Sequence, residues 1–251
     1  MRIGLQLYTV RDEMEKDFVG TLEKVAAMGY EGVEFAGYGG LTPEELSATL
    51  SRLNLKAVGS HIGLDQLTNH LDEQIEMNKA IGNKYLVCPW IAKEQYETME
   101  ALKKTVSSLT KAAERVQPHG MKIGYHNHAF ELEHEVDGKT VLEQIFELAP
   151  DVVTELDVCW VQYSGHDPLA WIDRYQGRLP FVHFKDLAIA EDGSPITVEL
   201  GKGTLDLASV AKKAKAAGAE WLIVEQDVTQ RGSLESVEAS LKWIKEHLKD
   251  L

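Results

Sequence analysis

Carboxylates and an imidazole that could bind a metal ion recur inside apolar segments of this sequence. Asp157 lies in VVTELDVCW, His183 in PFVHFKD and Glu225 in WLIVEQD. A carboxylate in such a segment cannot point into a dry core without a partner, because burying an unpaired charge is costly. Carboxylates that converge also repel each other, and a divalent cation is the simplest compensation. These residues therefore predict a metal site.

The donor types indicate which metals the site suits. Mixed oxygen and nitrogen ligands suit Mn²⁺, Mg²⁺, Co²⁺, Fe²⁺ or Zn²⁺, and there is no cluster of thiolates to favour zinc. Cys88 and Cys159 both lie in apolar runs, where we expect small core residues and no disulfide framework. We expect one divalent metal ion, whose identity the sequence leaves open.

Other polar residues occupy similar positions, and each has a structural interpretation beside the functional one. Glu34 lies in GVEFAG and could simply hold a loop at the mouth of a barrel. His61, which ends KAVGSH, could be a core histidine with satisfied hydrogen bonds. Glu155 lies two residues before Asp157, so both face the same side of a strand, and it could instead bond a neighbouring histidine.

The elements that must position these residues follow from an alternation of short apolar segments with longer segments of helical spacing. Strands are predicted at residues 3–8, 32–36, 56–61, 85–89, 122–127, 152–158, 180–185 and 221–226. Helices are predicted at residues 18–28, 41–53, 65–81, 94–117, 139–148, 205–217 and 233–248, with a further one that begins at 167–168. This alternation requires parallel strands, and eight of them favour a closed (β/α)₈ TIM barrel, an α/β fold forming one domain over residues 1–251.

An open doubly wound sheet is the alternative architecture. It should carry a glycine-rich phosphate-binding turn after its first strand, but that strand runs into LYTVRDEM, with no GxGxxG motif. The GKG at residues 201–203 follows no such strand, and we interpret it as a turn. In a barrel the active site forms at the carboxyl ends of the strands, where the candidate metal ligands lie.

The charge of the chain bears on its partners. It carries 26 Lys and Arg residues against 40 Asp and Glu residues, so its formal net charge is −14. Such a surface repels phosphate groups, which argues against nucleic acids and anionic membranes as partners. There is no apolar run of about 18 residues, and MRIGLQLYTV lacks the pattern of a signal peptide. We expect a cytoplasmic protein that acts on a small molecule.

Several short motifs occur in the order found in a known superfamily. These are LDVCW, VHFKD and VEQD, together with YHNHAFE, GLQLYTVR and HIGL. From residue 2 to about residue 228, the chain resembles the sugar phosphate isomerase/epimerase superfamily. Its members are xylose isomerase-like TIM barrels, which include ketose 3-epimerases, inosose dehydratase and endonuclease IV.

The resemblance implies a specific set of metal ligands. The superfamily usually binds one divalent metal through a Glu on the fifth strand, an Asp on the sixth, a His on the seventh and a Glu on the eighth. Asp157, His183 and Glu225 match the last three of these positions.

The fifth strand departs from the pattern. Where many members read Glu-Asn-His, this chain reads His126-Asn127-His128. Either Glu131 reaches back to the metal or an imidazole replaces the carboxylate, and we take Glu131 as the predicted ligand. The sixth strand also has Trp160 where several members have a His, which weighs against a multi-zinc site like that of endonuclease IV.

The resemblance also implies a mechanism. Members bind a carbonyl and an adjacent hydroxyl of a sugar to the metal, which stabilises the enediolate formed when a proton leaves the neighbouring carbon. Glu225 is the predicted acid/base carboxylate, and His126 or His128 could carry the second proton because imidazole titrates near neutral pH. The predicted substrate contacts are Glu34, His61, Trp90, Glu155, Trp160 and Lys185.

We therefore expect a metal-dependent isomerase or epimerase that acts on a sugar. The first alternative is a lyase, dehydratase or hydrolase that acts on a 3-keto sugar, a glycoside or an inosose. The change from Glu to His126 supports this alternative, because elimination does not need two symmetric bases. A distant alternative is an endonuclease that acts at abasic sites, against which the net charge argues. A homo-oligomer is possible in such a superfamily, and nothing in the sequence decides it.

Overall fold

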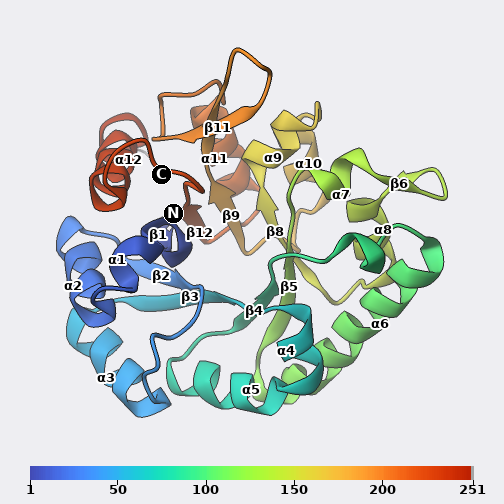
Figure 1. Ribbon diagram of the computed structural model, residues 1–251, viewed down its shortest axis with the longest axis horizontal. Helices are drawn as coiled ribbons and strands as arrows, with labels where there is room; N and C mark the ends of the chain where they lie inside the picture. The colour runs from blue at the N-terminus through green and yellow to red at the C-terminus, as the bar shows by residue number, and fades with distance from the viewer. Residues whose placement is uncertain (250–251) are drawn as a thin grey trace.

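Eight parallel strands close into a barrel in the computed structural model, which describes residues 1–249 (Figure 1). The strands are β1 (Arg2–Gln6), β2 (Gly32–Phe35), β3 (Lys56–His61), β4 (Tyr85–Cys88), β5 (Lys122–His126), β8 (Val153–Asp157), β9 (Phe181–Phe184) and β12 (Trp221–Val224). The barrel closes because β1 pairs in parallel with both β2 and β12. The predicted TIM barrel is confirmed, with each of its strands at a predicted position.

Helices surround the barrel on its outer side (Figure 1). The longer ones are α2 (Phe18–Met28), α3 (Pro43–Leu53), α4 (Leu64–Asn69), α5 (Leu71–Ala80), α6 (Met99–Val116), α8 (Val141–Leu148), α9 (Val158–Tyr163), α10 (Pro168–Arg174), α11 (Leu207–Ala216) and α12 (Ser233–His247). The shorter ones are α1 (Arg11–Met14), α7 (Phe130–Glu133) and the 3₁₀ helices η1 (Leu7–Val10), η2 (Lys93–Gln95) and η3 (Gln117–His119). Along residues 1–249, no helix combines the length and the apolar character needed to cross a membrane.

Local sequence signals explain where several helices begin and end. Thr42 and Glu45 form a capping box at the start of α3, and Gly29 ends α2 with φ at 100°. The helix predicted over residues 65–81 is instead two helices, α4 and α5, because the backbone at His70 leaves the helical region. The helix predicted over residues 94–117 becomes regular only at α6, where Thr98 caps its first turn.

Two antiparallel hairpins are absent from the sequence prediction. The first joins β6 (Glu135–Val136) to β7 (Lys139–Thr140) across Asp137 and Gly138, which both have positive φ, as a two-residue hairpin turn requires. The second joins β10 (Asp186–Ile189) to β11 (Pro195–Val198) and follows β9 directly. Gln226 donates a hydrogen bond to Thr197 O, so this hairpin is tied to the segment that follows β12.

The barrel interior is apolar at one end and polar at the other. A small buried cluster fills the end where the strands begin, and its members are Val58, Val87, Phe181, Trp221 and Ile223. Alternate residues of a strand face the same side, so β9 continues inward from Phe181 through His183 to Lys185. In the same way, Ile223 is followed by Glu225. The strands therefore carry the predicted polar residues into the carboxyl-terminal half of the barrel.

Candidate metal centre

Four buried side chains at the carboxyl ends of neighbouring strands form a group that could hold a metal ion. They are His126 at the end of β5, Asp157 at the end of β8, His183 within β9 and Glu225 directly after β12. Each offers one donor atom, and these atoms all lie within 4.8 Å of one another. We call these four residues the outer donor group. Two imidazole nitrogens with two carboxylate oxygens suit a divalent transition metal.

The contacts of Asp157 test whether a cation fits this group. Its Oδ1 accepts hydrogen bonds from Cys159 N and Trp160 N, at 2.9 and 3.1 Å, and so caps helix α9. Its Oδ2 is buried and accepts no hydrogen bond, although Lys185 Nζ lies 3.0 Å away. This oxygen shares the charge of Lys185 with Glu225 and Asp227, so one positive charge faces three carboxylates. Two buried carboxylates and two imidazoles that converge in this way fit a divalent metal.

Asn127 fixes the backbone beside this carboxylate. Its Oδ1 accepts a hydrogen bond from Asp157 N at 2.9 Å, and its Nδ2 donates to Asp157 O at 3.3 Å. Because Asn127 directly follows β5, it clamps the ends of β5 and β8 together. The sequence prediction does not single out Asn127 for this role, although its place between two candidate histidines is a signal.

The predicted ligand Glu131 lies outside the outer donor group. Its Oε1 accepts a hydrogen bond from Tyr125 Oη at 2.8 Å, and its Oε2 accepts one from His128 N at 2.7 Å. Burial raises the pKa of Glu131 to about 7. Both oxygens are therefore engaged within the β5–α7 segment, and no contact supports Glu131 as a ligand. The position is filled in the group by His126, the imidazole alternative.

A second polar layer lies beside the outer donor group. Oε2 of Glu155 lies 2.6 Å from His61 Nε2, 3.0 Å from His126 Nδ1 and 3.2 Å from His183 Nε2. Burial opposes ionisation of Glu155, but the positive charge of His183 and His61 holds its pKa well below the usual range. The residue is therefore a buried carboxylate that contacts three imidazole rings.

Glu34 completes this layer from β2. Its Oε2 accepts a hydrogen bond from Gln6 Nε2 at 2.8 Å and lies 2.6 Å from His183 Nε2. Burial and the charge of Glu155 raise the pKa of Glu34 to about 7. A Cβ on Gly59 would lie 2.3 Å from Glu34 Oε1, so only glycine leaves room there for this carboxylate. The sequence offers Gln6 as the polar residue of the first strand, but it does not point to Gly59.

Lys185 brings a buried positive charge to the same place. Its Nζ lies 3.0 Å from Asp157 Oδ2, 2.9 Å from Glu225 Oε2 and 3.0 Å from Asp227 Oδ2. Burial opposes its charged form, but the nearby carboxylates Asp157, Asp227 and Glu225 raise the pKa of Lys185 well above its usual range. The ammonium group is thus ionised. Asp227 follows Glu225 by two residues, and this spacing is the signal that could have found it.

A cavity of about 690 Å³ opens above the outer donor group. Several predicted residues line it, namely His61, Trp90, His126, His128, Trp160 and Glu225. Tyr8, Arg11, Asp227 and Val228 line it as well. Burial, together with the charge of Lys185, lowers the pKa of His128 to about 4, so this ring is neutral at neutral pH. Glu34, Glu155 and Lys185 do not line the cavity but contact residues that do.

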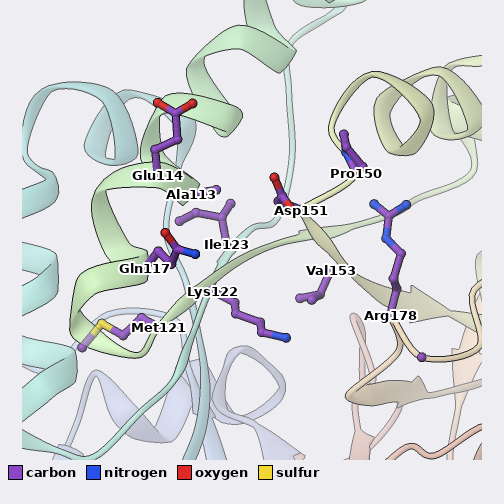
Figure 2. Close-up of a pocket in the computed structure, with 11 residues that line it drawn as sticks. Ala113, Glu114, Gln117, Met121, Lys122, Ile123, Pro150, Asp151, Val153 and Arg178 are labelled. Atoms are coloured by element: carbon purple, nitrogen blue, oxygen red, sulfur yellow. The ribbon is translucent and has the colours of Figure 1, made fainter.

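Another cavity, of about 270 Å³, lies at the opposite end of the barrel strands (Figure 2). Lys122 and Val153, at the starts of β5 and β8, are part of its lining. The Arg178 side chain beside it donates hydrogen bonds to the carbonyl oxygens of Phe146, Ala149 and Val152. This arginine ties loops together, and none of the predicted site residues lies there.

Comparison with known families gives a match over most of the chain. Residues 22–247 match the family model described as the xylose isomerase-like TIM barrel. A curated relative, inosose dehydratase from Geobacillus kaustophilus, is 27% identical over an alignment of 190 positions that covers 66% of this chain and 61% of that protein. The chain thus spans about three fifths of the length of this relative.

Solved structures show the same fold. A sugar phosphate isomerase/epimerase from Parabacteroides distasonis superposes with a TM-score of 0.83 at 22% identity, covering 98% of this chain and 94% of that one. The IOLI protein with a bound zinc atom superposes with a TM-score of 0.79 at 18% identity, covering 100% of this chain and 99% of that one. At these identities the likeness supports the fold alone.

Proposed function

The chain belongs to the family of xylose isomerase-like TIM barrels, and we propose that it uses a divalent metal to enolise a sugar or keto-sugar. In this reaction a proton leaves the carbon next to a carbonyl group. The observation that carries the proposal is the buried group of two carboxylates and two imidazoles, whose donor atoms all lie within 4.8 Å of one another. That group lies beneath a cavity large enough for a small molecule.

The side chains of the outer donor group would hold the ion. When bound there, a divalent cation supplies Lewis-acid stabilisation of the negative charge that develops on the substrate oxygen. Glu225 lines the cavity, and although burial opposes its ionisation, Lys185 and His183 hold its pKa well below the usual range. It is therefore ionised and placed to accept the proton from carbon.

The enolised sugar becomes an isomer or epimer, as the sequence predicts, if a second group returns a proton to carbon. His126 and His128 line the cavity and are the predicted candidates, and His128 is the one left free, because His126 belongs to the outer donor group. Burial lowers the pKa of both rings, so each is neutral at neutral pH and would have to pass a proton on rather than donate a stored one. A second ionised carboxylate is missing from the β5 side of the cavity, because Glu131 is held by Tyr125 and His128.

The arrangement of charged groups around the cavity favours elimination as the next step after enolisation. It needs one base for the carbon-bound proton and one acid for the leaving oxygen, and these can lie on the same side. Glu225 is the base, and once it holds the carbon-bound proton it can return that proton to the leaving oxygen on the same side. The ammonium group of Lys185, 2.9 Å from Glu225 Oε2, stabilises the ionised form of this carboxylate. The relative from Geobacillus kaustophilus, named for the dehydration of an inosose, is consistent with this choice. We therefore place a lyase or dehydratase first and an isomerase or epimerase second.

Two measurements on the purified protein test the proposal. Metal analysis should find one divalent ion per chain, and this ion should be lost from Asp157→Ala. Incubation in D₂O with inososes, ketoses and 3-keto sugars should incorporate deuterium or release water, and Glu225→Gln should abolish both. A metal-free protein whose exchange is unchanged by Glu225→Gln would overturn the proposal. Exchange with net epimerisation and no loss of water would return the isomerase to first place.

A further inference from the structure

The cavity above the outer donor group has a second part that is apolar and open to solvent. Tyr8 is 45% exposed, Trp90 55% and Val228 63%. Over residues 1–249 these are three of six exposed large hydrophobic side chains, and all three line this one cavity. Single exposed hydrophobic residues are ordinary on protein surfaces, whereas a cluster beside a polar site marks a binding surface. We call these three residues the apolar rim.

Contacts with the rest of the mouth hold the apolar rim in place. The guanidinium of Arg11 lies 4.1 Å from the ring centroid of Tyr8. The same group donates hydrogen bonds to Tyr8 O at 2.7 Å and to Asp227 O at 3.0 Å. Val228 N donates to Thr197 Oγ1 at 3.1 Å, which ties Val228 to the β10–β11 hairpin. The Tyr8 and Val228 parts of the apolar surface are thus formed without a ligand.

The charged groups of the mouth are unsuited to a phosphorylated substrate. Arg11 is the only lysine or arginine among the residues that line the cavity, and its guanidinium is already bound to two carbonyl oxygens. Lys185 faces three carboxylates, and His61, which also lines the cavity, faces Glu34 and Glu155. The ionised Glu225 also lines the cavity and would repel a phosphate group. A neutral substrate therefore fits the mouth better than a sugar phosphate does.

The size of the cavity leaves room beyond one sugar ring. Its volume of about 690 Å³ falls within the range of pockets that enclose drug-sized ligands. A sugar bound over the outer donor group would place any further substituent against the apolar rim. A second sugar there would bring hydroxyl groups that need hydrogen-bond partners, whereas Trp90 and Val228 offer mainly apolar surface. An aromatic group would match it, because aromatic rings pack well against one another.

We infer that the substrate is an unphosphorylated glycoside with a keto group on its sugar ring, whose aromatic aglycone packs against Tyr8, Trp90 and Val228 while its sugar lies at the outer donor group. Elimination from such a keto-glycoside would release the aglycone, because the base removes the proton next to the keto group and the glycosidic oxygen leaves. This inference rests on the proposed function for the position of the sugar. It adds the substrate class, and it assigns the apolar rim to the aglycone.

Calorimetric titration of the metal-loaded protein tests this assignment. The probes are phenyl and methyl glycosides of glucose, galactose and mannose, with cellobiose and glucose 6-phosphate for comparison. At least one phenyl glycoside should bind about tenfold more tightly than its methyl counterpart. In Trp90→Ala this ratio should fall to about one. Ile189→Ala is the matched control, since Ile189 is also exposed but does not line the cavity, and it should keep the ratio.

Several results would overturn the inference. They are equal affinity for phenyl and methyl glycosides, absence of binding by every phenyl glycoside, or tighter binding of cellobiose or glucose 6-phosphate. A dimer in sedimentation that dissociates in Trp90→Ala would assign the rim to a second copy of the chain instead. Failure of the proposed function is distinguishable, because it appears as missing metal and unchanged exchange in Glu225→Gln, whatever the ratio of phenyl to methyl affinity.

Discussion

One carboxylate oxygen organises three imidazole rings at the centre of this protein. Glu155 Oε2 faces one ring nitrogen each of His61, His126 and His183. A nitrogen that faces Glu155 does not also face the outer donor group, so the contact directs the opposite nitrogen there; His183 Nδ1 indeed lies 2.8 Å from Glu225 Oε2. Residues that orient metal-binding histidines in this way tune the affinity for the metal. We therefore propose that Glu155 positions the histidines, and the substrate contact predicted from the sequence stays a prediction.

Replacement of Glu155 by Gln should weaken metal binding by about 10- to 100-fold, because the imidazole rings lose their negative partner while the side-chain volume is kept. Competition with a chromophoric chelator measures the dissociation constant. Glu199→Gln is the matched control, since Glu199 is also buried but bonds Arg231 and Ser236. Equal metal affinity in the two variants would contradict the positioning role.

His126 and Glu131 can be separated as candidate ligands. His126→Ala should lose the bound metal, because it removes one of the four donors of the outer group. Glu131→Ala should retain the metal and lose stability by about 1–3 kcal/mol, because Tyr125 Oη and His128 N are left without their acceptor. Metal content by mass spectrometry and urea unfolding give the two readouts. The reverse pattern would make Glu131 the ligand, as the sequence predicts.

Metal affinity should fall as the pH falls. Burial raises the pKa of Asp157 to about 6, and the negative charge of Glu155 and Glu34 raises the pKa of His183 well above its usual range despite burial. Binding must displace the His183 proton near neutral pH and a second proton, from Asp157, below about 6. A plot of log affinity against pH should have a slope of about one above pH 6 and a slope of about two below it. Calorimetry in buffers of different ionisation enthalpy counts the protons, and a flat profile would contradict the assignment.

At this scale the sequence predicts which residues gather but not how they divide into layers. Asp157, His183 and Glu225 stand out because a charged residue at the end of an apolar strand is costly to bury unless a partner or a cation meets it. Glu155 and Asp157 share one face of β8, and only the structure shows that Asp157 lies beside Lys185 in the outer donor group while Glu155 contacts the three histidines. The engagement of Glu131 depends on Tyr125 Oη, a contact that no spacing in the sequence reveals.

Among the elements, the loop after β11 depends on one aspartate. Asp186 is fully buried, and its carboxylate accepts hydrogen bonds from Gly201 N and Gly203 N, both at 2.9 Å, and from Leu205 N at 3.2 Å. The GKG segment is therefore a turn that wraps around a carboxylate. Because Asp186 directly follows Lys185, this loop also fixes the position of the buried ammonium group.

Gly203→Ala should destabilise the protein by about 1–3 kcal/mol, because its Cβ would lie 2.2 Å from Asp186 Oδ1 and 2.3 Å from Leu187 O. Gly63→Ala is the control, since a Cβ there meets no atom within 4 Å. The free energy of unfolding in urea measures both variants. Equal free energies of unfolding for the two variants would show that the loop around Asp186 can shift to accommodate the added Cβ without losing stability.

The sequence prediction finds the barrel elements and misses both hairpins. Each barrel strand is an apolar segment bounded by polar turns, and each helix between them has a period that a short window reveals. The strands β6 and β7 have two residues each, too few to show alternation. Asp137-Gly138 and Asp192-Gly193 stand at the two hairpin turns, and this dipeptide is the signal that could have found them. No glycine or proline marks the break at His70.

For the whole molecule, the excess of acidic residues decides which partners can approach. The net charge is −14, and the lysine that lies deepest in the site is already neutralised by carboxylates. A duplex with an abasic site should therefore be neither cleaved nor bound in a mobility-shift assay at about 50 mM salt, where electrostatic binding to DNA is strong. Cleavage that disappears in Glu225→Gln would contradict this prediction and favour the endonuclease alternative.

The divided carboxylate of Asp157 bears on how such sequences evolve. One of its oxygens caps the amino-terminal end of helix α9, and the other faces the outer donor group. A descendant of this protein that abandoned catalysis would still need an acceptor at the start of α9, so selection for folding alone would retain the aspartate. An aspartate at this position in a distantly related sequence is therefore weak evidence that the protein is catalytically active. His126 and Glu225 are the better markers, because drift would erase them first.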